Sequence, residues 1–138
     1  MHQYVRVVGS LLLALAPFGC SGSRQPAQAG ITVTGIDVGR SVTADKTIAD
    51  ETDAFEPADT FYVSIKTDGS GPSATVTARW TYEDGQVVNE STQNIAPTTG
   101  VTVTEFHLSR ADGWPAGAYK VEVLLNGVSA GTQDFKVS

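Results

Sequence analysis

Apolar and polar residues alternate with a period of two along most of the chain after residue 30, the pattern of strands that bury one face. The clearest run is 73–83, in which every second residue from Ala74 to Tyr82 is apolar and those between are polar. Because successive strand side chains point to opposite faces, one face of this run should be buried. Similar runs separated by turn residues predict seven strands, at residues 31–38, 60–67, 73–83, 86–95, 101–109, 119–125 and 128–137.

Two dipeptides predict tight hairpins between neighbouring strands. Asp84-Gly85 follows run 73–83, and Asn126-Gly127 precedes run 128–137. Such pairs favour a type I′ turn, in which both central residues have positive φ. The returning run 86–95 is more polar than its partner, so we expect it to lie at the edge of a sheet.

Seven short strands with turn signals between them predict an all-β fold: a single antiparallel seven-stranded β-sandwich over residues 31–138. A barrel is the alternative. Hydrophobic residues make up 41% of the chain and charged residues only 17%, and the frequent Gly, Thr, Val and Ser suit strands and turns better than helices.

The segment 113–123, GWPAGAYKVEV, resembles the approach to the penultimate strand of immunoglobulin-like and fibronectin type III-like domains. Tyr119 matches the tyrosine that closes the corner between the sheets in those families, and Trp80 matches their central core tryptophan. The resemblance covers residues 31–138 and implies an immunoglobulin-like β-sandwich. Unlike antibody domains the chain has one cysteine, so apolar packing must hold the sheets together.

The first twenty residues have the layout of an export signal. Arg6 supplies a positive charge, and residues 7–16 form an apolar run too short to remain as a membrane-spanning helix. Residues 16–20, APFGC, resemble the lipobox of bacterial lipoproteins, with the small residue Gly19 directly before Cys20. The alternative is an ordinary signal peptide that is cut later, near Ala29.

The lipobox resemblance implies that residues 1–19 are removed as a signal peptide and that Cys20 carries acyl chains such as palmitate. Several chains make membrane attachment effectively permanent. Residues 20–30 then form a flexible tether, because the segment is rich in small, polar and turn residues. The protein is expected in the cell envelope, lipid-anchored, and Ser21 implies the outer membrane if the host is Gram-negative.

Net charge and histidine content exclude several classes of function. The formal net charge is -6, and no Lys or Arg cluster interleaves with aromatic residues, so nucleic acid is not an expected partner. His107 is the one histidine that remains after export, and it alternates outward from Phe106 and Leu108. A general base beside a nucleophile is not evident, so we predict no enzyme activity and no cofactor.

The acidic segment 45–59 holds six carboxylates and one base, Lys46. Carboxylates on a loop are the ligands that calcium prefers, and Asp50, Asp53 and Glu56 are the candidates. Their spacing matches no EF-hand loop, so the alternative that we favour is a solvated acidic loop with no metal.

Trp114 and Tyr62 are candidates for an exposed aromatic contact with a glycan or protein. The alternative for Trp114 is a ring folded over the end of the sandwich beside Pro115. We predict a non-catalytic binding or interaction module that meets an envelope or extracellular protein, with run 86–95 open to an added strand. The second hypothesis is a structural accessory, or an inhibitor of a secreted enzyme with the Trp114 loop as a plug.

Overall fold

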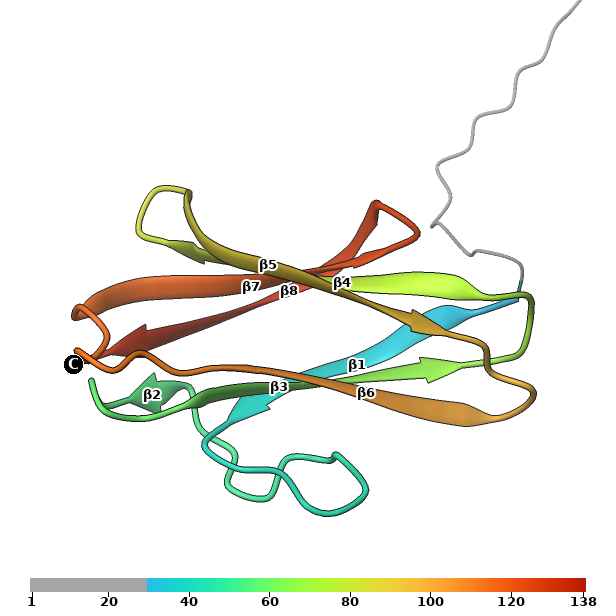
Figure 1. Ribbon diagram of the computed structural model, residues 1–138, viewed down its shortest axis with the longest axis horizontal. Helices are drawn as coiled ribbons and strands as arrows, with labels where there is room; N and C mark the ends of the chain where they lie inside the picture. The colour runs from blue at the N-terminus through green and yellow to red at the C-terminus, as the bar shows by residue number, and fades with distance from the viewer. Residues whose placement is uncertain (1–29) are drawn as a thin grey trace, which may run out of the picture.

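The computed structural model describes residues 30–138, which form two packed β-sheets and, within that range, no helix (Figure 1). The described part of the chain therefore contains no helix that could span a membrane. The eight strands are β1 (Thr32–Gly39), β2 (Ala54–Phe55), β3 (Phe61–Asp68), β4 (Ala74–Tyr82), β5 (Gln86–Ile95), β6 (Val101–Leu108), β7 (Gly117–Leu125) and β8 (Val128–Val137).

One sheet has three strands in the order β1-β3-β6, and the other has five in the order β2-β8-β7-β4-β5. The prediction of an all-β sandwich is confirmed, and the barrel is excluded by the two separate sheets. The prediction of seven antiparallel strands is wrong, because β2 is an eighth strand and pairs parallel to β8. A two-residue strand has no periodicity, so the sequence offered no signal for it. Its pairing is extended by backbone hydrogen bonds from Lys136 to Asp53 and from Ser138 to Phe55.

The core lies between the sheets and is centred on Phe61 of β3. The ring of Phe61 stacks on that of Trp114, with centroids 4.4 Å apart, and on that of Trp80, at 6.0 Å. It meets three further rings edge-on at 4.8 to 5.3 Å, those of Phe55, Tyr119 and Phe135. Trp80 is 1% exposed, as the resemblance implied for the core tryptophan.

The two predicted hairpins differ in their turns. Asn126 and Gly127 both have positive φ, as the predicted type I′ turn requires. In the β4–β5 connection, positive φ occurs at Glu83 and Gly85 and not at Asp84, so the turn has three residues. The reason is that Glu83 pairs with Ala118: its N–H donates to the Ala118 carbonyl, and its carboxylate accepts from the Ala118 N–H.

The sandwich has two distinct ends (Figure 1). β1 begins at one end, beside the connection between β3 and β4, and β8 finishes at the other. The second end, here called the distal end, also carries the turn 83–85 and the segment 109–116 between β6 and β7. The start of β1 and the distal end therefore lie at opposite ends of the sandwich.

Candidate functional site

The distal end contains a hollow of about 280 Å³ between the five-stranded sheet and the segment 109–116. Residues from β4, β5, β7 and the segment 109–116 line it. They are Tyr82, Gln86, Val88, Arg110, Trp114, Pro115 and Tyr119. Its surface is therefore mostly aromatic and aliphatic, and Arg110 is its one charged group.

Hydrogen bonds fix the aromatic walls of this hollow. The Tyr119 hydroxyl donates to the Pro115 carbonyl at 2.7 Å, which is the tyrosine corner that the resemblance implied. The Tyr82 hydroxyl donates to the Ala116 carbonyl, also at 2.7 Å. Burial raises the pKa of the Tyr119 hydroxyl, and the neighbouring Tyr82 raises it further. Tyr119 therefore stays protonated and keeps its hydrogen bond at neutral pH.

Trp114 is buried and does not offer the exposed contact considered above. The side chain is 5% exposed, and its indole N–H donates to the Asp59 carbonyl at 3.0 Å. This is the alternative arrangement, a ring folded over the end of the sandwich. A plug built from the Trp114 side chain would first have to break its stacking on Phe61.

Tyr62 lies elsewhere, on the outer face of the three-stranded sheet. It is half-buried beside His107, with ring centroids 5.3 Å apart. The exposed His107 ring nitrogen Nδ1 lies 2.6 Å from the Glu105 carboxylate. Tyr62 and Trp114 therefore belong to different surfaces and do not form a joint aromatic contact.

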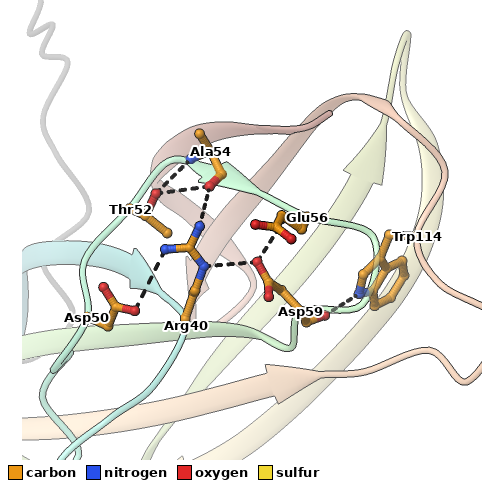
Figure 2. Close-up of polar contacts among 7 residues, drawn as sticks. All are labelled: Arg40, Asp50, Thr52, Ala54, Glu56, Asp59 and Trp114. Carbon is orange, nitrogen blue, oxygen red and sulfur yellow. Dashed lines mark hydrogen bonds and ion pairs between the residues drawn. The ribbon is translucent and has the colours of Figure 1, made fainter.

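The acidic segment is organised by Arg40, which follows β1 (Figure 2). Arg40 Nε donates to Asp59 Oδ2 at 2.9 Å, Nη2 donates to the Ala54 carbonyl at 3.1 Å, and Nη1 lies 3.7 Å from Asp50 Oδ2. Asp59 Oδ2 also accepts the Glu56 backbone N–H at 2.8 Å. That backbone bond and the Arg40 guanidinium hold the pKa of Asp59 below its ordinary value. The cluster therefore fastens the segment to β1.

The calcium candidates Asp50, Asp53 and Glu56 are not brought together. Asp50 faces Arg40, whereas Asp53 lines a separate hollow of about 340 Å³ with Asp37 and Glu51. Within residues 30–138 no three Asp, Glu, His or Cys side chains are grouped so that they could hold a metal ion. The physical reason is that a guanidinium already occupies the centre of the acidic segment.

Asp59→Asn is expected to make stability less sensitive to acid. Because the folded-state pKa of Asp59 is depressed, its contribution is present above the unfolded value, about 3.9, and is lost as pH falls through the folded value. The variant should be less stable at pH 6 but should lose less stability between pH 5 and 2. Urea denaturation over this range measures the difference, with Asp112→Asn as the control. Parallel pH profiles for Asp59→Asn and the wild type would contradict the assignment.

The edge position of β5 is confirmed. β5 has ten residues and pairs only with β4, and all of its residues except Val88 and Ile95 are exposed. Gln93 Nε2 donates to the Glu105 carbonyl of β6 at 2.7 Å, so β5 is covered near its end. Figure 1 shows β5 and β6 diverging from there toward the distal end. Residues 86–92 therefore form an open edge, and the hollow lies beside its first residues.

Cys20, the signal peptide and most of the tether lie outside the described residues. The lipid anchor at Cys20 stays a prediction.

Comparison with known proteins identifies the fold. An immunoglobulin-like protein from Pseudomonas aeruginosa is 15% identical, with a TM-score of 0.53, over 82% of this chain and 100% of that one. An alkylpurine DNA glycosylase from Pseudomonas fluorescens, bound to DNA with an abasic-site analogue, is 14% identical, with a TM-score of 0.53, over 79% of this chain. A β-glucosidase from Listeria innocua in complex with glucose is 8% identical, with a TM-score of 0.51, over 80% of this chain.

The described chain thus has an immunoglobulin-like β-sandwich fold. It spans only 30% of the glycosylase and 16% of the β-glucosidase. No protein-family model matches the sequence, and no curated protein does either. At these identities the likeness defines the fold alone.

Proposed function

We propose that this protein is a lipid-anchored domain of the cell envelope that binds an extended segment of another envelope or extracellular protein, without catalysis. The observation that carries the proposal is the open edge of β5, residues 86–92. An extended peptide that pairs with such an edge gains main-chain hydrogen bonds as an added strand.

The composition of β5 supports this role. Natural edge strands are usually kept short or protected by lysine, proline or inward-pointing charge, because an open edge pairs with other chains. β5 contains no lysine and no proline, and its one charged residue, Glu90, is paired with Arg79 at 2.9 Å. A β-bulge at Val88 interrupts the ladder with β4, but the rest of this long edge carries no lysine, proline or unpaired charge, which suits recognition better than isolation.

The position of the start of β1 relative to β5 agrees with the proposal. Lipid on Cys20 would hold the chain at the membrane, and the tether would enter the sandwich where β1 begins. The open part of β5 lies toward the distal end, away from that point (Figure 1). A partner in the periplasm or outside the cell would then reach β5 without contacting the membrane. In a Gram-negative host, Ser21 favours the outer membrane.

A photoreactive side chain at Val87 is expected to cross-link to a partner in intact envelopes. Val87, Val101 and Val128 are similarly exposed, at 57%, 62% and 44%, but only Val87 lies on β5. The same reactive group at Val101 and Val128 is therefore the matched control. Adducts of discrete mass should form only when the reactive group is at position 87. In a separate variant, Val87→Lys, the affinity for the captured partner should fall by about tenfold, because a lysine on the edge opposes strand pairing.

The signature of strand addition is slower amide hydrogen exchange in residues 86–92 when the captured partner is bound. Equal cross-linking at all three valines, or binding that leaves exchange in β5 unchanged, would show that the edge is not the binding surface.

A further inference from the structure

The hollow at the distal end lies where the open edge begins. Two of its lining residues, Gln86 and Val88, belong to β5, while Tyr119 comes from β7, two strands away in the same sheet, and Trp114 from the segment 109–116. Val88 is the extra residue of a β-bulge in β5 and is half-buried against the core, so its side chain faces between the sheets at that point. A strand added to β5 would project every second side chain toward that same side.

The walls of the hollow are suited to an apolar group. The polar atoms of its three aromatic side chains are already used, by the carbonyls of Ala116, Pro115 and Asp59. What remains for a ligand is ring and aliphatic surface together with the polar side chains of Gln86 and Arg110. The volume of about 280 Å³ is near the lower limit of small-molecule pockets, and it fits one or two side chains.

The charge at the rim points to an anionic neighbour. Arg110 is exposed, and within residues 30–138 it makes no ion pair, whereas Arg40 and Arg79 each bind two carboxylates. Among the three arginines of residues 30–138, Arg110 is therefore the one whose guanidinium is left for a carboxylate from outside the chain. Guanidinium groups bind carboxylates through two parallel hydrogen bonds.

We infer that this hollow is the specificity pocket for an acidic peptide segment that pairs with β5: an apolar side chain fills it, and an adjacent carboxylate binds Arg110. The inference rests on the proposed function, because strand addition is what brings the peptide to the pocket. The carboxylate comes either from an Asp or Glu side chain or from the C-terminus of the peptide.

The test uses the full-length protein in detergent and synthetic peptides of about ten residues, rich in Val and Thr to favour the extended state. One set carries Phe or Leu next to Glu, with an amidated end. A second replaces Glu by Gln, and a third replaces the apolar residue by Ser. A fourth lacks Glu but ends in a free carboxylate directly after the apolar residue. Acidic oligosaccharides form a separate arm.

The Phe-Glu and Leu-Glu peptides are expected to bind at least about tenfold more tightly than the Gln and Ser sets. Arg110→Gln should remove the difference between Glu and Gln, and Arg110→Glu should favour Lys in place of Glu. Lys120→Gln, which removes an exposed positive charge from the outward side of β7, is the matched control and should change nothing. Tight binding by the fourth set would identify the C-terminus as the source of the carboxylate.

Hydrogen exchange separates the two ideas. If peptides slow exchange in residues 86–92 but show no preference for Glu and no dependence on Arg110, the pocket inference fails and the proposed function stands. If the preference appears without protection of β5, the pocket is real and strand addition is wrong. Binding of the oligosaccharides in place of the peptides would overturn the inference.

Discussion

Phe61→Ala is expected to lower the free energy of unfolding by about 3–5 kcal/mol. Phe61 contacts five other aromatic rings and joins the two sheets at the centre of the core. Its removal leaves a cavity that rigid rings cannot fill, and no disulfide holds the sheets together. Because domains of this size are stable by about 5–15 kcal/mol, the loss is a large fraction of the total.

Urea denaturation followed by tryptophan fluorescence measures this effect directly, since Trp114 stacks on Phe61. The melting temperature should fall by at least about 10 °C. Tyr62→Ala is the matched control, because Tyr62 is the next residue along β3 and is half-buried on the opposite face. A loss as large for Tyr62→Ala as for Phe61→Ala would show that the aromatic cluster is not the centre of stability.

Cys20→Ala is expected to abolish membrane attachment while leaving the sandwich intact. The wild-type protein should carry the added mass of its acyl chains and sediment with membranes, because several chains make release negligible. The variant should lack that mass and appear in the soluble fraction. Its melting temperature should match the wild type after detergent extraction, because Cys20 precedes the residues that form the sandwich. Mass spectrometry and fractionation measure both effects.

Ser21→Asp supplies the control for the anchor in a Gram-negative host. It should keep the acyl mass but retain the protein at the inner membrane, since Asp after the lipidated cysteine favours retention. An unmodified, soluble wild-type protein that begins near Ala29 would show instead that an ordinary signal peptidase processes the chain, and the anchor would be wrong.

Alternation predicted the strands well because the period of two is a local property. The run 73–83 and the edge run 86–95 became β4 and β5 nearly as expected. Local patterns say little about what a loop packs against. The burial of Trp114 depends on Phe61, far away in the sequence, and no spacing rule connects the two residues. The same holds for Arg40, whose position among the carboxylates of the acidic segment is set by the end of β1.

The hollow at the distal end is also a product of long-range structure. Its lining comes from two stretches of the chain, 82–88 and 110–119, of which the sequence singled out Trp114 as a candidate exposed contact and Tyr119 as a corner tyrosine. The one available signal was the segment 113–123, whose resemblance implied that Tyr119 closes a corner between the sheets. A corner of that kind implies a closed end of a sandwich, but it does not indicate which rings stay accessible.

The arrangement of β1 and β5 has a mechanical consequence. β1, which continues from the tether, belongs to one sheet, and β5 belongs to the other. Tension between a membrane anchor and a partner held on β5 would therefore cross from sheet to sheet through side-chain packing and the loops that connect the sheets, with no disulfide to share the load. The aromatic rings around Phe61 would then resist shear, and the strength of that packing would limit the load that the protein carries before it unfolds.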